Sequence, residues 1–284
     1  MSDISKIQNE KPLPELLEFC IINVDKPAGP TSFKVCEKIR NILNAKKAGH
    51  FGTLDPIVTG VLPVALNRAC RLSNYFMKKD KEYIGKMQIH KDISEEKLKQ
   101  EMDKFIGKIM QKPPVKSRVK RVLRERYVNK FKIIKKQGKI VEFHSDVQAG
   151  TYIRKLISDL GEKIGGAHMI ELKRVRAGLF LEKDSYKIEE IEKAFKEWKE
   201  KNNEEFLRKI LIPAEIIQQV ITKVDVKEES VKSLLNGKPL MKDDLIGKIP
   251  NSELISVFSK EKFIGIYKKV NENNIIARPE FVLN

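Results

Sequence analysis

The stretch KEYIGKMQIH, residues 81–90, places Tyr83, Gly85, Met87 and Ile89 at every second position. Successive side chains of a β-strand point to opposite faces, so these four residues share one face if the chain is extended here. The spacing therefore predicts a strand with one side turned towards a core, and it favours a fold built around a sheet.

Further strands and helices are predicted on both sides of this stretch. Residues 127–136 and 140–147 predict a hairpin around Gln137-Gly138, and residues 168–175 predict another strand. Helical spacing of apolar residues is found after Thr31-Ser32 and over 94–106, 153–164 and 188–198. Gly161 and the pair Gly165-Gly166 are interpreted as helix stops. Strands interleaved with helices indicate an α+β fold with a mainly antiparallel sheet and flanking helices.

Sequence patterning divides the chain into three parts. Residues 1–18 are expected to form an N-terminal arm, 19–215 the main domain, and 216–284 a small β-rich domain. Within the main domain, residues 46–63 contain three glycines and two prolines and predict a loop. A loop of that length in a compact domain is unusual unless it has a function.

The distribution of charge indicates a polyanionic partner. The chain holds 56 Lys and Arg against 39 Asp and Glu, a net charge of +17. Residues 108–139 contain thirteen basic residues and one acid, Glu125, so this stretch alone carries +12. Nucleic acid is the first partner to consider for such a cluster. A generally Lys-rich composition is the alternative explanation for the total charge.

The sequence lacks the motifs typical of metal sites, disulfide frameworks, nucleotide cofactors, secretion signals and membrane helices. The three cysteines form no CxxC pair and the four histidines no HxxxH pair, so we expect no metal and no disulfide framework. No Walker loop and no GxGxxG follows a strand, and we expect no cofactor. The polar N-terminus lacks an apolar signal region, and no apolar run reaches the ~20 residues of a membrane helix. We expect a cytoplasmic protein with no membrane partner.

Asp55 is the leading candidate for a catalytic group. Pro56 disfavours a helical backbone at Asp55, Gly52 allows close backbone approach, and Thr53 can bond within the turn. On these local features alone, a surface Asx-turn is an equally good explanation of Asp55.

Arg154, Tyr83 and the dipeptide Lys26-Pro27 are further candidates for such a site. Arg154 opens the helix after Gly150-Thr151-Tyr152, where a bidentate pair would hold a nearby carboxylate ionised. A phosphate contact or a surface position would explain it as well. Tyr83 could stack on a base or be a core tyrosine, and Lys26-Pro27 could orient a loop.

Five motifs, taken together and in order, resemble the family that contains bacterial tRNA pseudouridine-55 synthase and dyskerin. They are residues 21–32 (IINVDKPAGPTS), 48–56 (AGHFGTLDP) with 59–66 (TGVLPVAL), 81–83 (KEY), 149–156 (AGTYIRKL) and 171–178 (ELKRVRAG). Two residues depart from the family pattern. Phe51 stands where a small residue is usual, and Gln148 stands where the guided branch has an acid.

The resemblance implies a reaction and the residues for it. The family isomerises uridine to pseudouridine in RNA without metal or cofactor. It implies catalytic roles for Asp55, Tyr83, Arg154 and Leu172: Asp55 as nucleophile or base, Tyr83 stacked on the base, Arg154 paired with Asp55 and Leu172 lining an apolar wall. The positions expected to contact substrate are Lys26, His50, Gly52, Thr53, Lys116, Lys120 and Arg121.

Residues 111–121 and 166–169 are similar to the dyskerin-like branch, in which an H/ACA guide RNA selects the uridine. The resemblance then implies guide RNA, rRNA or tRNA and small H/ACA core proteins as partners, and a PUA-like domain over 216–284. A stand-alone enzyme for the tRNA T-loop is the alternative within the family. A non-catalytic RNA-binding scaffold is the alternative outside it.

Overall fold

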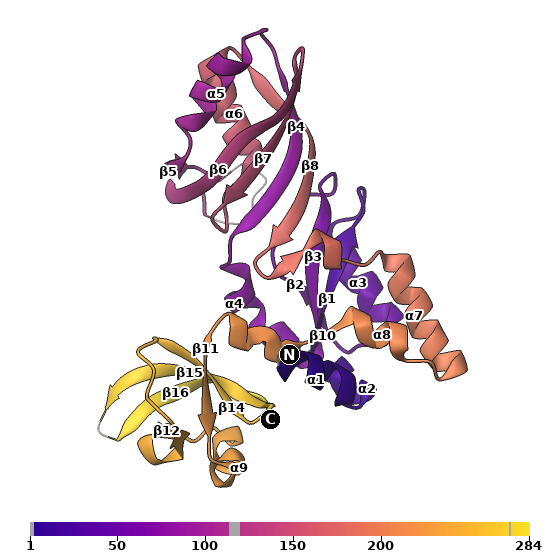
Figure 1. Cartoon of the computed structure of the whole chain (residues 1–284), viewed down its shortest axis with the longest axis vertical. Helices are drawn as coiled ribbons and strands as arrows, with labels where there is room; N and C mark the ends of the chain where they lie inside the picture. The colour runs from indigo at the N-terminus through magenta and orange to yellow at the C-terminus, as the bar shows by residue number, and fades with distance from the viewer. Residues whose placement is uncertain (1–2, 114–119, 273) are drawn as a thin grey trace.

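The strand predicted at residues 81–90 is β4 (Lys81–Ile89), a central strand of a ten-stranded sheet in the computed structural model of the chain (Figure 1). The structure describes residues 3–113, 120–272 and 274–284. Every second residue of β4 from Lys81 to Ile89 is buried, as the spacing predicted. β4 pairs antiparallel with a strand on each side. Because its alternate residues must face the core, their spacing fixes the register of all three strands.

The large sheet has the order β10-β1-β3-β8-β4-β7-β6-β5, with β2 beside β3 and β9 beside β8. Its other strands are β1 (Cys20–Lys26), β2 (Ala48–His50), β3 (Thr59–Leu66), β5 (Gly107–Gln111), β6 (Arg124–Gln137), β7 (Ile140–Val147), β8 (Ala167–Ala177), β9 (Phe180–Leu181) and β10 (Leu211–Pro213). Among these described pairs, β3 with β8 is parallel and the rest are antiparallel. The expected mainly antiparallel α+β core is confirmed.

Helices flank this sheet at the four predicted places, and two more that the sequence analysis did not predict lie at residues 73–77 and 205–210. They are α3 (Ser32–Ile42), α4 (Ser73–Met77), α5 (Glu95–Asp103), α6 (Ile153–Ile164), α7 (Ile188–Lys201) and α8 (Glu205–Ile210). Apolar residues of α5 and α6 join those of β4 and β7 in one core, and Figure 1 shows the two helices together against that part of the sheet. α6 ends at Gly165 with a left-handed φ of 85°, as predicted.

The interpretation of Gly161 as a helix stop is wrong. Gly161 lies inside α6 and is buried. A Cβ at this position would lie 2.5 Å from the backbone nitrogen of Ala167, the first residue of β8. The missing side chain therefore lets helix and strand approach each other, and it does not end the helix.

The prediction of a loop over residues 46–63 is partly wrong, because β2 and the first half of β3 occupy it. β2 pairs with the end of β3, with His50 opposite Val64. Gly60, with φ of 95°, sits where a Cβ would meet the carbonyl oxygen of Arg174 at 2.2 Å, so glycine here permits the β3–β8 contact. The remaining loop is the short segment from Phe51 to Val58.

The N-terminal arm consists of two helices, α1 (Asp3–Glu10) and α2 (Leu13–Glu18). The Gln8 amide donates to the carbonyl oxygens of Arg208 and Leu211 at 3.0 and 3.1 Å. Arg208 donates back to the carbonyl oxygens of Gln8 and Lys11. These reciprocal bonds hold the arm against α8 and β10.

A second, six-stranded sheet forms the C-terminal part, with the order β12-β16-β15-β14-β11-β13. Its elements are β11 (Thr222–Val226), α9 (Val231–Leu235), β12 (Leu240–Met241), β13 (Leu245–Ile246), β14 (Leu254–Ser259), β15 (Lys262–Glu272) and β16 (Ile275–Val282). Figure 1 shows this sheet, in orange to yellow, beyond α4 and the N-terminal helices. The β-rich character expected after residue 216 is present.

An apolar cluster joins the two sheets. Phe19 next to β1 stacks on Phe263 of β15 with ring centroids 5.4 Å apart. Phe51 belongs to the same cluster: it is 2% exposed and stacks on Phe76 at 4.8 Å. The bulk of Phe51, which departs from the family pattern, therefore fills the core between the loop at residues 51–58 and α4.

None of the helices in the described part of the chain is long and apolar enough to cross a bilayer.

We predict that Gly161→Ala destabilises the fold by about 1–3 kcal/mol, because the added methyl group would force α6 and β8 apart. Gly49→Ala is the matched control, since its Cβ would meet its nearest neighbour, the Cys70 sulfur, at an ordinary 3.7 Å. Urea unfolding of both variants measures the difference. Equal stabilities would contradict the close-packing role of Gly161.

Candidate active site

Asp55 lies in the loop between β2 and β3, flanked by two buried residues, Leu54 and Val58. Its own side chain is 54% exposed and forms an ion pair with Arg154, whose side chain is 52% exposed. Arg154 is in the first turn of α6, 99 residues further along the chain. The structure thus brings together the two leading candidates from the sequence and leaves the pair open to solvent.

Lys26, at the end of β1, holds the far side of this loop. Its side chain is fully buried, and its ammonium donates to the carbonyl oxygens of Pro27, Pro56 and Val58 at 2.8, 3.0 and 2.8 Å. Burial lowers the pKa of Lys26, and the nearby carboxylate of Asp55 opposes that shift. All three ammonium hydrogens are used, so the expected substrate contact by Lys26 is replaced by a role in shaping the loop.

Ser32 holds the near side of the loop. Its hydroxyl accepts from the backbone nitrogen of Leu54 at 2.8 Å and donates to the carbonyl oxygen of the same residue at 2.9 Å. Ser32 is the first residue of α3 and is 1% exposed. The backbone is therefore fixed at both residues next to Asp55, while its carboxylate pairs with Arg154 and remains open to solvent.

Arg174, on the buried face of β8, lies beneath the loop. Its guanidinium donates to the carbonyl oxygens of Val61 and Gly52 at 2.7 and 3.0 Å and hydrogen-bonds to the Tyr83 side chain. Burial lowers its pKa, and Tyr83 opposes the shift. The sequence did not single out this residue, although an arginine two positions after Leu172, within the motif at 171–178, was a usable signal.

Lys81 is a second buried cation near Arg174. Its side chain lies close to Gly52, and its ammonium donates to the carbonyl oxygens of Met77 and Lys79. Burial and the positive charge of Arg174 lower the pKa of Lys81 from 10.5 to about 8. The neutral amine retains two N–H donors, enough for both carbonyls.

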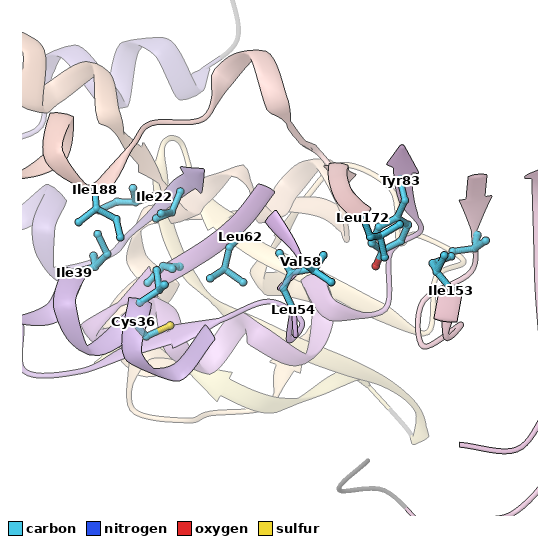
Figure 2. Packing of buried hydrophobic residues seen from close by; sticks show 14 of the residues in the cluster. Ile22, Cys36, Ile39, Leu54, Val58, Leu62, Tyr83, Ile153, Leu172 and Ile188 are labelled. Carbon is cyan, nitrogen blue, oxygen red and sulfur yellow. The ribbon is translucent and has the colours of Figure 1, made fainter. Parts of the chain in front are cut away.

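Tyr83 and Leu172 belong to one apolar cluster with Leu54, Val58 and Ile153, the residue before Arg154 (Figure 2). Tyr83 and Leu172 are each 9% exposed. A Cβ at Gly85, opposite Leu172 in the β4–β8 register, would lie 2.9 Å from the Leu172 methyl group. Glycine at position 85 therefore makes room for Leu172 beside Tyr83.

The other residues expected around Asp55 adopt different environments. His50 is partly buried, its Nδ1 has no hydrogen-bond partner among the described residues, and burial and Arg174 lower its pKa. It is therefore a neutral ring beside the loop. Gly52 has a left-handed φ of 107°, which a side chain would strain, and Thr53 is exposed.

The described residues of the basic stretch lie mainly on β5 and β6, at the edge of the large sheet. Lys120 and Arg121 are exposed, and Arg121 Nε donates to the carbonyl oxygen of Pro113 at 3.2 Å. Lys116 lies outside the described residues. Gln148 links the end of β7 to β6, because its side-chain oxygen accepts from Tyr127 N at 3.1 Å. That bond suits an amide or an acid, so the departure at position 148 preserves the local structure.

The arrangement supports chemistry by a carboxylate. Asp55 can act as a nucleophile or a base towards a group that enters from solvent, and Arg154 can orient it. Tyr83, Leu172 and Ile153 provide an apolar surface nearby. In the parts of the chain that the structure describes, no three His, Cys, Asp or Glu side chains are grouped as metal ligands.

Comparison with known proteins gives consistent matches. Residues 40–153 match the model of the TruB family pseudouridylate synthase N-terminal domain, and 154–218 match the tRNA pseudouridylate synthase B C-terminal domain. The chain is 42% identical over 233 residues to the probable tRNA pseudouridine synthase B of Korarchaeum cryptofilum, covering 81% of this chain and 72% of that protein. It is 44% identical over 229 residues to the protein of that name in Methanocaldococcus jannaschii, covering 80% and 68%.

Solved structures match over almost the whole chain. A crystal structure of a Cbf5-Nop10-Gar1 complex contains a chain with a TM-score of 0.89 and 37% identity, covering 97% of this chain and 88% of that one. An H/ACA RNP bound to a substrate RNA containing 2′-deoxyuridine contains one with a TM-score of 0.88 and 34% identity, covering 98% and 89%. The match therefore includes both sheets.

We predict that the contribution of Lys81 to the stability of the protein rises with pH. The folded protein releases this proton near pH 8 and the unfolded chain near 10.5. Between these values the unfolded state binds more protons, so wild type gains stability as pH rises, by on the order of 1–3 kcal/mol. Lys81→Met removes that gain.

Unfolding of wild type and Lys81→Met from pH 7 to 10 measures this contribution as a change in their stability difference. Lys99→Met, at an exposed position of α5, gives the baseline for losing a lysine. A difference in unfolding free energy between wild type and Lys81→Met that stays constant from pH 7 to 10 would contradict the prediction.

Proposed function

The chain belongs to the TruB family of pseudouridine synthases, and we propose that it isomerises selected uridines of RNA as the catalytic subunit of a guide-RNA particle. The observation that carries the guided function is the match over 97% of the chain to the Cbf5 complex with Nop10 and Gar1. The proposed partners are a guide RNA, a target in rRNA or tRNA, and small core proteins of the H/ACA type.

We assign the central role in the reaction to Asp55. The target uridine leaves the stack at a cost of a few kcal/mol and enters beside the loop. Asp55 then acts as nucleophile or base, and the bond from C1′ to N1 breaks. The uracil turns, a bond from C1′ to C5 forms, the C5 proton leaves and N1 gains one. The reaction needs no net oxidant or reductant.

The surrounding residues suit this reaction in their observed positions. Arg154 orients the Asp55 carboxylate, and Tyr83 offers its ring to the displaced base. Leu172 supplies an apolar wall, and neutral His50 can contact the space beside the loop. Gly52 and Thr53 keep the loop backbone accessible to the ribose.

The exposed basic residues suit binding to the RNA backbone. Lys120 and Arg121, with Lys116 by sequence, are proposed to contact phosphates of the substrate. The six-stranded C-terminal sheet over residues 216–284 is proposed as a PUA-like RNA-binding domain. An RNA substrate and three free cysteines agree with a location in the cytoplasm.

A stand-alone enzyme that modifies tRNA is the second candidate. It is favoured by the relatives named probable tRNA pseudouridine synthase B, which match over two thirds or more of their length.

We predict that Asp55→Asn forms no detectable pseudouridine, because the amide cannot act as nucleophile or base. The Kd for RNA should stay within about threefold, because phosphate contacts dominate the affinity. Asp103→Asn, at an exposed position of α5, is the control. Product formation by Asp55→Asn at the wild-type rate would refute the assignment. A wild-type protein that binds RNA but forms no product would support a scaffold instead.

We predict that purified protein with guide RNA and core proteins converts a matched target faster than protein alone converts an unmodified tRNA transcript. Quantifying pseudouridine in both reactions measures the preference. Full activity on tRNA with no gain on the guided target would establish the stand-alone function and remove the guided one.

A further inference from the structure

Gln111 makes an unusual contact with the backbone of a distant residue. It is the last residue of β5, and its side chain is 2% exposed. Its Nε2 donates to the carbonyl oxygen of Tyr152 at 3.3 Å, and its Oε1 accepts from the backbone nitrogen of Tyr152 at 3.0 Å. One side chain thus binds both backbone groups of a residue 41 positions later, as a neighbouring strand would.

Tyr152 is the N-cap residue of α6 and makes no side-chain capping bond. Its carbonyl oxygen also accepts from Leu156 N at 2.9 Å, the first hydrogen bond of the helix. A helix start normally depends on the side chain of its N-cap residue to satisfy and orient its first turn. Here the side chain that anchors the cap comes from β5, so Gln111 sets where α6 begins.

Arg154 depends on that anchor because its side chain is half exposed. Its guanidinium pairs with the carboxylate of Asp55, and that side chain is exposed to about the same extent. An exposed ion pair contributes about 0–1 kcal/mol and does not hold two side chains in a single geometry. The point from which the guanidinium reaches Asp55 is therefore set by the backbone of the first turn of α6.

We propose that Gln111 is a positioning residue of the reaction, which fixes the start of α6 so that Arg154 meets Asp55 in the productive geometry. This inference rests on the proposed function, since it assigns a role in the same site. Gln111 is buried and hydrogen-bonds to the backbone of Tyr152, so it acts through Tyr152 and Arg154.

The first test is Gln111→Met, which keeps the length of the side chain and loses both hydrogen bonds. We expect kcat to fall by roughly 10- to 100-fold, as expected for a small displacement of a catalytic group, with KM and the Kd for RNA within about threefold. Gln100→Met, at an exposed position of α5, should keep the wild-type kcat. Assays are run well below the melting temperature of each variant. A wild-type kcat for Gln111→Met would overturn the proposal.

The second test separates positioning from general support of the fold. In an Arg154→Lys background, Gln111→Met should lower kcat by less than about threefold, because the residue through which Gln111 acts is already altered. A purely structural role would give the same factor in both backgrounds, and that result would overturn the proposal. If Gln111→Met does not fold, Gln111→Glu keeps the acceptor for Tyr152 N and loses the donor. Comparing its effect on kcat in the two backgrounds then distinguishes positioning from general support in the same way.

The wild-type protein and Asp55→Asn are measured beside these variants, on the tRNA transcript and on the guided target. If wild type turns over and Gln111→Met has the same kcat, this inference is wrong and the proposed function stands. Absence of turnover by wild type on both substrates sinks the proposed function, and this inference with it.

Discussion

The ion pair between Asp55 and Arg154 is the interaction on which the site depends, and it cannot position itself. Both side chains are more than half exposed, so water screens their attraction and competes for their hydrogen bonds. The relative position of the two side chains must therefore be set by the backbone next to Asp55 and the backbone next to Arg154. Lys26 and Ser32 fix the residues around Asp55, while Gln111 fixes the residue before the helix that carries Arg154. All three anchors are buried and bind backbone groups.

Buried cations around the loop that carries Asp55 follow a common pattern. Lys26, Lys81 and Arg174 are each at most 6% exposed, and backbone carbonyls accept hydrogen bonds from all three. A buried charge is costly unless it is hydrogen-bonded, and carbonyl dipoles meet that need without adding a second carboxylate near Asp55. The loop is thereby fixed at Gly52, Pro56 and Val58, and positive charge is concentrated behind it. That charge favours the approach of an anionic backbone such as RNA.

The sequence predicted the parts of the fold whose signal is local. The alternation at Tyr83 to Ile89 identified β4, and the spacing from Ile153 identified α6 with its end at Gly165. A loop is predicted in place of the start of β3 because Gly60 and Pro63 normally weaken a strand. Gly60 is required there by the Arg174 backbone, and Pro63 still offers its carbonyl oxygen to Phe51 N. The contacts that make Gly60 and Pro63 acceptable in β3 come from segments distant in the chain, so no local sequence pattern predicts them.

Some residues of the candidate site could be predicted from the sequence, and others are apparent only in the structure. Asp55, Arg154, Tyr83 and Leu172 could be found because family motifs mark them. Gln111 and Arg174 were not singled out from the sequence, because each binds backbone groups of segments distant in the chain. Phe51 departs from the family pattern at the start of the Asp55 loop, and its stacking on Phe76 in the core between the sheets explains its size. Since the loop begins in that core, a smaller residue at position 51 would leave a cavity under it. The loop geometry therefore depends on packing that reaches the C-terminal sheet, as well as on its own hydrogen bonds.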